Sequence, residues 1–239
     1  GADMNKYLDS GNEARIKKAY ESRDPRLQMA VITPYAQYNG ASSGIAHTYT
    51  LRWPYRGSDS AEPFDIRTDT NDKFYYLWRK FVPEGLEQTE RDTYGLDIPL
   101  IRYAEVLLLK AEALNEWGST HESEAIRCVN EVRRRAGHVE LNNATYPATK
   151  VNGQSDLRER IRNEYYWEIG GEDSMYFHEL RWGTWKDKKF DNNRNGLMQM
   201  WGETTYTWYW LGDQCWSWPI PAKEMEMNSN LEQNEGWIN

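Results

Sequence analysis

The sequence predicts a mainly α-helical fold, built from helix hairpins with long loops and a few short strands. Residues 98–137 show apolar positions at the three- and four-residue spacings of two amphipathic helices. Residues 157–182 repeat this arrangement more weakly, and stretches rich in glycine, proline and serine predict loops elsewhere. We expect residues 1–239 to form one domain, with a loop-rich region at 1–97, hairpins at 98–183 and an aromatic-rich irregular segment at 184–239.

The loop-rich region opens with a short helix predicted over residues 10–22. Asp24-Pro25 ends it, because the residue before a proline avoids the α conformation. A short strand is predicted from Leu27 to Thr33 and another from Phe74 to Phe81. Between them, residues 34–70 are punctuated by glycine, serine and proline and predict one long loop, and loops of such length are often functional.

Two helices are predicted in the central hairpin. Gly118 ends the first helix, and Ser119 stands three residues before Glu122, the spacing of a capping box that starts the second helix. Each helix has one apolar face, formed by Ala104, Leu107, Leu108, Ala111 and Leu114 in the first and by Ala125, Val129, Val132 and Ala136 in the second. Two such helices bury little by themselves, so they need packed neighbours, as the units of a solenoid do.

A second helix pair follows a loop at residues 142–155. Asp156 and Glu159 predict a cap for a third helix from Leu157 to about Ile169. Gly170-Gly171 ends this helix, and a short fourth helix runs to Trp182. After an irregular stretch rich in tryptophan and tyrosine, Pro219 and Pro221 predict an extended segment.

Aromatic residues are the main candidates for ligand binding, because the chain has 12 tryptophans and 16 tyrosines. Flat rings pack on the apolar faces of sugars, while amide, carboxylate and guanidinium groups bond the hydroxyls. The first candidate cluster lies in the long loop, where Asn39 and Asp59 could also bond hydroxyls, and consists of Tyr49, Arg52, Trp53, Tyr55 and Arg56. The second consists of Tyr206, Trp208, Tyr209 and Trp210, where alternation would place three rings on one side of a strand.

Tryptophans also fill protein cores, and several are expected to do so here. We expect this role for the tryptophans on or beside predicted helices and strands, namely Trp78, Trp117, Trp167 and Trp182. Trp216 and Trp218 flank the proline segment and are expected to hold it in place.

Charge and composition exclude several functions. The net charge of −8 disfavours a nucleic-acid partner, since an acidic surface repels phosphate. Arg133, Arg134 and Arg135 form the best basic run, but they fall in a last helical turn, where cations favour the helix dipole. No run of 18 apolar residues predicts a membrane span. Cys128 and Cys215 are expected as two buried free thiols, with one disulfide as the alternative.

No catalytic residue, metal ligand or cofactor site is expected. The four histidines are isolated, and His178-Glu179 lacks the second histidine of a helical zinc site. Glu172-Asp173 is the most site-like acidic pair, but negative charge there also suits the start of the following helix. With 37 acidic residues in the chain, an acidic pair by itself does not indicate a glycoside hydrolase.

Four segments in order along the chain resemble the SusD/RagB family, in its C-terminal half. They are residues 20–35 around Asp24-Pro25-Arg26, the hairpin with RYAEVLLLKAEALNE at 102–116 and EAIRCVNEVRRRAG at 124–137, residues 157–183, and the closing residues 218–237. The resemblance implies an α/α superhelix of tetratricopeptide-like hairpins under a loop-rich binding face. Tyr103-Ala104-Glu105 and Pro219-Ile220-Pro221 match family patterns whose role there is structural. One departure is that many members show a Gly-x-Arg-aromatic pattern after the third helix, whereas this chain has Gly171-Glu172-Asp173-Ser174 and lacks the arginine.

The resemblance also implies a function. Such proteins are non-catalytic glycan or nutrient binders, lipid-anchored at the outer face of the outer membrane, and deliver oligosaccharides to a SusC-like TonB-dependent transporter, as in starch utilization systems. The chain has no signal peptide or lipid-anchoring cysteine near its start, so the anchor is expected outside it, and Gly1 resembles a cloning remnant. A helical scaffold that docks onto the transporter without touching ligand is the alternative, because helix hairpins commonly bind proteins.

Overall fold

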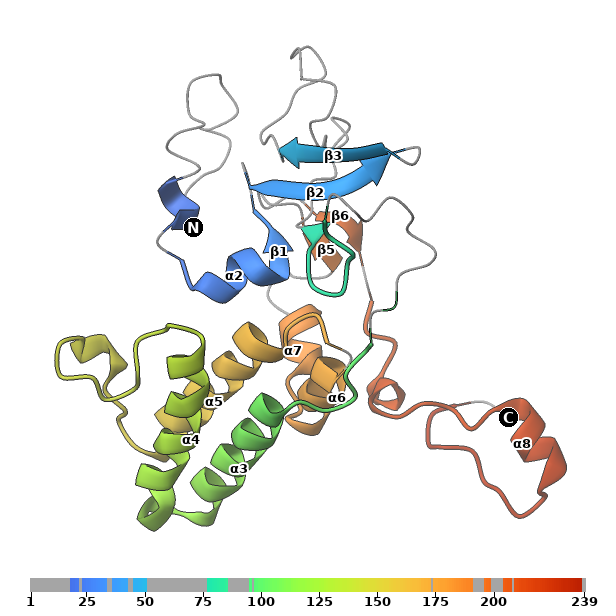
Figure 1. Ribbon diagram of the computed structural model, residues 1–239. Helices are drawn as coiled ribbons and strands as arrows, with labels where there is room; N and C mark the ends of the chain where they lie inside the picture. Colours follow the sequence, from blue (N-terminus) through green and yellow to red (C-terminus); the bar gives the residue numbers. More distant parts are fainter. Residues whose placement is uncertain are drawn as a thin grey trace. The chain divides into compact units, whose positions relative to one another are not determined.

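A computed structural model describes residues 18–21, 23–33, 36–42, 45–50, 77–85, 95, 97–172, 174–190, 196–198, 204–207 and 209–237 (Figure 1). The chain divides into two compact units, Gly1–Met175 and Tyr176–Asn239. In the first unit the elements are α2 (Pro25–Ala30), β1 (Val31–Ile32), β2 (Gln37–Ser42), β3 (Ile45–Thr50), β4 (Leu77–Trp78), α3 (Tyr103–Trp117), a 3₁₀ turn (Ser119–His121), α4 (Glu122–Arg135), a second 3₁₀ turn (Pro147–Thr149) and α5 (Gln154–Ile169). Helix α6 (Ser174–Arg181) begins at the boundary between the units, and the second unit continues with α7 (Trp185–Lys189), β5 (Gly196–Met198), β6 (Thr204–Thr207), a 3₁₀ turn (Asp213–Trp216) and α8 (Ala222–Met227).

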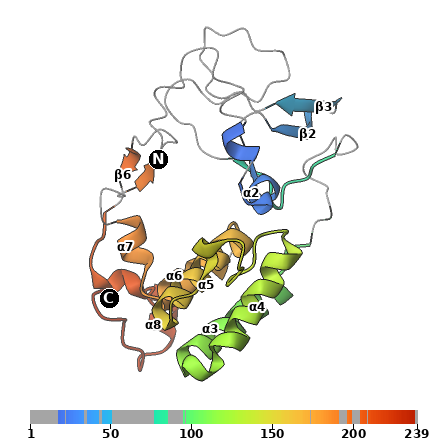
Figure 2. The same ribbon diagram turned by 90° about the vertical axis from the view of Figure 1, so that its left-hand side faces the viewer.

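Helices α3, α4 and α5 pack side by side and form the core of the first unit (Figures 1 and 2). Leu108 of α3, Val129 of α4 and Ile161 of α5 are completely buried. Burying a side chain of this kind stabilises a fold by roughly 1.5–3 kcal/mol. The predicted central hairpin is confirmed, and α5 is the neighbour that its two apolar faces need.

The loop from α4 to α5 is fastened by a buried side chain. Asn130 of α4 accepts from the Leu141 amide through Oδ1 at 2.7 Å and donates from Nδ2 to the Leu141 carbonyl at 3.2 Å. Buried polar groups need such partners, because an unmade hydrogen bond costs about 1–3 kcal/mol. The loop is thereby held against the end of α4.

The two predicted helix caps are wrong in detail. Ser119 begins a 3₁₀ turn, and His121 rather than Ser119 precedes α4 without a side-chain cap. Helix α5 begins at Gln154, three residues before the prediction, with Gly153 at its N-cap. Asp156 therefore lies inside the first turn, where its carboxylate accepts from the Asn152 amide at 2.8 Å. The carboxylate still satisfies a backbone donor at the helix start, but from inside the helix.

The loop-rich region contains more regular structure than predicted. The segment expected as a strand from Leu27 begins as helix α2, which Asp24 caps by accepting from the Arg26 amide, and only Val31–Ile32 is extended. Strands β2 and β3 form an antiparallel hairpin within the stretch predicted as loop, with Tyr38 opposite Tyr49.

The strand predicted from Phe74 is short in the described residues, where β4 pairs antiparallel with β1 through Trp78 and Val31. The Trp78 ring lies over the backbone that ends α5. A Cβ at Gly171 would come within 2.7 Å of this ring, and Gly171 has a φ of 83°. Both facts favour glycine there, and they confirm that Gly170-Gly171 ends the helix.

In the second unit, the proline segment is held by residues close to the C-terminus. The Ile220 amide donates to Gln233 Oε1 at 2.7 Å, and Gln233 Nε2 donates back to the Ile220 carbonyl at 2.9 Å. Trp237 Nε1 donates to the Ser217 carbonyl at 2.9 Å, and Asn234 Nδ2 donates to the Trp218 carbonyl at 2.6 Å. The closing segment therefore folds back on itself through side chain to backbone bonds.

Candidate functional site

Three carboxylates lie in a row along α5 and just beyond it. Glu164, Glu168 and Glu172 are four residues apart, so they point to one side of a helix that turns every 3.6 residues. The side chain of Glu164 is completely buried, and those of Glu168 and Glu172 are only 2% and 7% exposed. Buried charges of this kind need partners, because an isolated ion in the interior costs several kcal/mol.

Two arginines from different elements meet at Glu164. Arg26 Nη1, from α2, donates to Glu164 Oε1 at 2.8 Å, and Arg133 Nε, from α4, donates to Oε2 at 2.7 Å. Arg26 also donates to both oxygens of Asp24, at 3.0 and 2.7 Å. Although burial opposes its charge, the hydrogen bonds to Asp24 and the charge of Glu164 raise the pKa of Arg26. Helices α2, α4 and α5 are thus joined by charge-assisted bonds.

Glu168 accepts from three guanidinium groups. Arg26 Nη1 donates to Oε2 at 3.1 Å, Arg102 Nη1 donates to Oε1 at 3.0 Å, and Arg135 Nη2 also donates to Oε1. Among the described residues, Glu168 is the only ion-pair partner of Arg135, whose side chain is 60% exposed. One buried carboxylate therefore pairs with three cations. Arg135 is the most exposed of the three, and its charge is the least compensated.

Glu172 completes the row with Lys80 and Arg102, at 2.5 and 2.7 Å. Lys80 Nζ also donates to the carbonyls of Glu168 and Gly170, at 3.0 and 3.2 Å, so it occupies the negative end of α5. Burial opposes the charge of Glu172, but hydrogen bonds from Arg102 and Lys80 lower its pKa. Hydrogen bonding to Arg26 likewise outweighs burial and lowers the pKa of Asp24.

These lowered pKa values predict loss of stability in acid. Below the ordinary Glu value of 4.5, the unfolded chain takes up a proton that folded Glu172 resists, so the free energy of unfolding falls as the pH falls through the folded pKa. Urea unfolding at pH 7, 5, 4 and 3 measures this dependence. We expect Glu172→Gln to be less stable at pH 7 and to show a shallower pH dependence than the wild type; equal slopes would mean that Glu172 is not the group that titrates.

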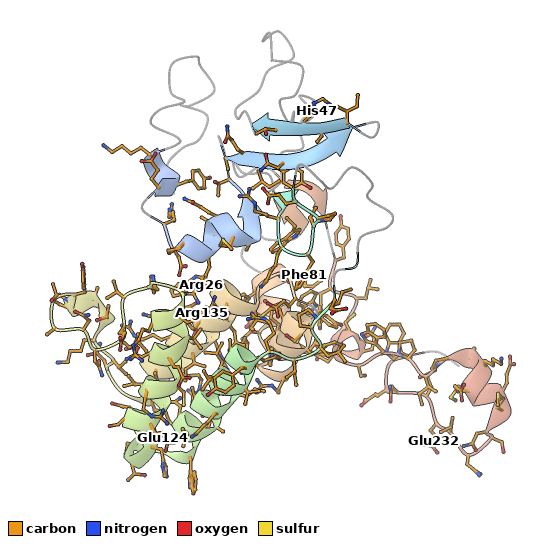
Figure 3. The ribbon with its side chains drawn as sticks, viewed as in Figure 1. Arg26, His47, Phe81, Glu124, Arg135 and Glu232 are labelled. Atoms are coloured by element: carbon orange, nitrogen blue, oxygen red, sulfur yellow. The ribbon has the colours of Figure 1, made fainter. Side chains whose placement is uncertain are left out.

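A pocket of about 310 Å³ opens beside this ion-pair network in the first unit. Figure 3 labels three of its residues, Arg26 on α2, Phe81 after β4 and Arg135 at the end of α4. Four cations and one carboxylate share its lining with apolar side chains; the residues are Arg26, Met29, Ala30, Lys80, Phe81, Arg102, Arg135, Trp167 and Glu168. We call this the cationic pocket.

Aromatic side chains gather around α7 in the second unit. Tyr176 packs edge-on against Trp185 with ring centroids 4.9 Å apart, and its hydroxyl accepts from Trp218 Nε1 at 3.1 Å. Lys189 lies 5.3 Å over the Trp185 ring. Phe177, next to Tyr176, and Trp218 are 64% and 70% exposed. We call these four aromatic residues the exposed ring group.

A second group of aromatic rings lies close to α7 and consists of Phe190, Trp210 and Trp216. Trp210 packs edge-on against Phe190 and Trp216, with centroids 5.3 and 5.0 Å apart. Lys186 lies 5.5 Å over the Trp210 ring, whose Nε1 donates to Asp213 at 3.4 Å. Trp210 is half-buried, so this group combines a partly accessible ring with one cation and one carboxylate.

The predicted binding residues are only partly described by the structure. Arg52, Trp53, Tyr55, Arg56 and Trp208 lie outside the described residues. Tyr49 lies in β3 and Tyr206 in β6, where the backbone alone is described. Trp210 lies beside Lys186 and Asp213, as described above, and Tyr209 is exposed. Among the predicted residues, Trp210 therefore has known polar neighbours, and the binding roles of all the predicted residues, Trp210 included, stay predictions.

The expected core role of several tryptophans is wrong. Trp117, Trp78 and Trp167 are 76%, 53% and 44% exposed. Trp117 is the last residue of α3, beyond the apolar face, and its ring stacks on His121 with centroids 4.3 Å apart. Trp167 packs against Arg133 and against the edge of His138. Large rings at helix ends thus cover polar neighbours here instead of entering the core.

The remaining tryptophans divide between packing and exposure. Trp182 is half-buried and stacks on His178, and Trp216 is half-buried against Trp210. Trp218 was expected to hold the proline segment, but Gln233 and Asn234 bond that segment and the Trp218 ring is exposed. Trp218 does tie the start of this segment to Tyr176 through its indole, but side chains that follow in sequence satisfy the backbone groups of the segment.

Sequence reasoning missed the ion-pair network. The spacing of Glu164, Glu168 and Glu172 was a visible signal, but acidic residues at four-residue spacing usually lie on solvated helix faces. From the sequence, the three arginines at 133–135 are expected to interact only with the negative end of the helix dipole. The structure places them in the last turn of α4 and also pairs them with Glu164, Glu140 and Glu168 in turn.

Both cysteines are free thiols, as expected, with Cys128 buried and Cys215 half-buried. Burial raises the pKa of the Cys128 thiol, which disfavours the reactive thiolate. Within the described part of the chain, no helix is long and apolar enough to cross a membrane, and no three His, Cys, Asp or Glu side chains are grouped to hold a metal ion.

Comparison with known proteins agrees with this fold. The family model described as the SusD family matches residues 4–237, so the chain belongs to the SusD family. The SusD-like protein P38 of Formosa agariphila is 32% identical over 139 residues, which is 58% of this chain and 24% of that protein. The starch-binding protein SusD of Bacteroides thetaiotaomicron is 28% identical over 161 residues, 67% of this chain and 25% of its own length. The chain thus spans about a quarter of the length of these curated relatives.

Solved structures show the same mainly helical, SusD-like fold. A SusD-like protein from Bacteroides fragilis matches with a TM-score of 0.59 and 23% identity, over 92% of this chain and 40% of that one. A SusD homolog from Bacteroides thetaiotaomicron matches with a TM-score of 0.55 and 21% identity, over 94% of this chain and 43% of that one.

Proposed function

We propose that this chain forms part of a non-catalytic carbohydrate-binding protein at the outer-membrane surface. Membership of the SusD family and similarity to a protein named as starch-binding support carbohydrate binding. In this proposal the intact protein is held by a lipid anchor and passes an oligosaccharide or polysaccharide to a SusC-like TonB-dependent transporter. The whole protein's ligand, anchor and partner are inferred from its family, because the chain spans about a quarter of its curated relatives.

The exposed ring group is the observation that most favours a glycan ligand. Phe177 and Trp218 present apolar faces to solvent, the Tyr176 hydroxyl is bonded to Trp218, and the Lys189 ammonium lies over the Trp185 ring. Exposed rings beside hydrogen-bonding groups match the two surfaces of a sugar, which has apolar faces bordered by hydroxyls. The half-buried Trp210 lies beside Lys186 and Asp213. It therefore offers a second aromatic ring with polar groups next to it.

A protein-docking scaffold is the second candidate, and one observation favours it. Helix α3 keeps an exposed apolar surface, with Tyr103, Val106 and Leu109 at three-residue spacing and Leu100 before them. Large exposed apolar surfaces often mark contacts with another protein. The two candidates are compatible, because they concern α3 in the first unit and α7 in the second.

The decisive test compares two exposed tryptophans. We expect Trp218→Ala to weaken binding of soluble oligosaccharides about 5- to 150-fold, corresponding to roughly 1–3 kcal/mol for loss of an aromatic anchor. Titration calorimetry against a panel of neutral oligosaccharides, beginning with maltooligosaccharides, measures the affinity.

Trp117→Ala is the matched control, since Trp117 is equally exposed but lies at the end of α3. It should leave sugar affinity unchanged, and both variants should unfold near the wild-type temperature. If the wild type binds no oligosaccharide in the panel while it still binds the transporter, the scaffold candidate replaces this one.

A further inference from the structure

The cationic pocket lies in a network with excess positive charge. Among the described residues, five side-chain cations meet four carboxylates there: Arg26, Lys80, Arg102, Arg133 and Arg135 against Asp24, Glu164, Glu168 and Glu172. His138 beside Asp24 adds little charge at neutral pH, because burial lowers its pKa more than Asp24 raises it. A local excess of cations is notable in a chain whose net charge is −8.

The excess charge is located at the pocket. Four of the five cations line it, and Arg133 is the exception, committed to buried Glu164 and to the Val139 carbonyl. Among the described residues, the Arg135 side chain makes one hydrogen bond, from Nη2 to Glu168, although a guanidinium offers five N–H donors in a planar fork. Its side chain is largely exposed, so donors remain for a ligand in the pocket. Guanidinium groups bind carboxylate and sulfate-like oxyanions through two parallel hydrogen bonds.

The rest of the lining is apolar and partly strained. Trp167 is 44% exposed, and Phe81 and Met29 provide further apolar surface. Phe81 has a φ of 60°, in the left-handed region that side-chain-bearing residues avoid. Strained residues persist where the surrounding structure holds them, and they gather at binding sites.

Several bonds hold the turn that carries Phe81. The amides of Arg79 and Lys80 both donate to the Ala30 carbonyl, at 2.9 and 3.2 Å, and the Arg79 guanidinium is bonded to Glu84 and to the Gln37 carbonyl. Lys80 and Phe81 are therefore placed at the pocket by a turn fastened to both α2 and β2.

We propose that the cationic pocket binds one acidic residue of a sugar chain, with its carboxylate or sulfate on Arg135 and its ring against Trp167 or Phe81. The volume of about 310 Å³ is at the lower end of small-ligand pockets, which suits a single sugar ring rather than a chain. This inference rests on the proposed sugar-binding function, but it concerns a different site from the exposed ring group. It therefore extends the ligand class from neutral to acidic glycans.

Glucuronate and glucose test this directly, because they differ only at the carbon that carries the carboxylate. Ligand-detected NMR titrations of the whole 239-residue chain should show saturable binding of glucuronate and at least about tenfold weaker binding of glucose. Glucose 6-sulfate forms a second arm that separates sulfate from carboxylate recognition. Arg135→Gln should weaken binding of the acidic sugar at least about fivefold, because one charge-assisted contact is lost.

Arg134→Gln is the matched control, since Arg134 is equally exposed on the same turn of α4 but pairs with Glu140 outside the pocket. Trp218→Ala should leave glucuronate affinity unchanged, so failure of the exposed ring group and failure of this pocket are distinguished. The proposal is overturned if neither acidic sugar binds, or if Arg135→Gln and Arg134→Gln bind glucuronate equally. It is also overturned if a hexaglutamate peptide binds through Arg135 and the acidic sugars do not, which would indicate an acidic protein partner.

Discussion

Glu164→Gln should lower the free energy of unfolding by roughly 3–5 kcal/mol, the cost of breaking a buried ion pair from one side. The Glu164 side chain is completely buried and accepts from Arg26 at 2.8 Å and from Arg133 at 2.7 Å. A glutamine amide has the same shape, but it turns an NH₂ donor toward one of these two guanidinium groups and leaves both charges less compensated. Urea unfolding followed by circular dichroism at pH 7 measures the loss.

Glu116→Gln is the control for this prediction. Glu116 forms an equally short ion pair with Arg158, at 2.6 Å. Like the pairs of Glu164, it connects two helices, in this case α3 and α5. Both side chains are about a third to nearly a half exposed, so solvent screens the pair and its loss should cost less than about 1 kcal/mol. Equal losses in the two variants would show that burial does not determine the strength of these ion pairs.

Leu108→Ala should cost about 2–5 kcal/mol, because it removes a large side chain from the centre of the α3–α4–α5 core. Leu108 is completely buried, and the close packing of the three helices limits how far they can collapse into the cavity. The adjacent Leu109 is 37% exposed on the other side of the same helix.

Leu109→Ala changes the same chemical groups at almost the same place in the sequence, and we expect it to cost less than about 1 kcal/mol. The difference in the urea midpoint between the two variants is the measured quantity. Similar midpoints would contradict the observed orientation of α3, because the two positions would then be equally buried.

The buried ion pairs explain how a short helix outside the core is held. Helix α2 has six residues, too few to be stable alone. Its Arg26 reaches Glu164 and Glu168 of α5, which are more than a hundred positions away in the sequence. Loss of Glu164 should therefore release α2 together with the part of the pocket that it lines.

Local patterns made part of this fold predictable. Leu107, Leu108 and Leu114 follow the helical period, and their burial in α3 confirms the predicted face. Gly118 and Gly171 end helices because glycine tolerates positive φ, a property of one residue and its neighbours. The family resemblance depended on the same short segments in order, and the match over residues 4–237 agrees with it.

Long-range partners were not predictable in the same way. The glycines and serines around β2 and β3 predict a loop, because such residues are typical of turns, whereas pairing across strands depends on the partner strand. The exposure of Trp78 and Trp117 depends on whether another element covers them, which no local pattern records.

Spacings along the chain were enough to predict the helical hairpins, the glycines that end two of their helices and the family. Only the tertiary structure decided the partners of the charges: Arg26, Arg102 and Arg135 come from three separate segments and meet at Glu168. Charge pairing depends on distance in space and on burial, whereas helical periodicity depends on distance along the chain. The cationic pocket is therefore visible only in the folded chain.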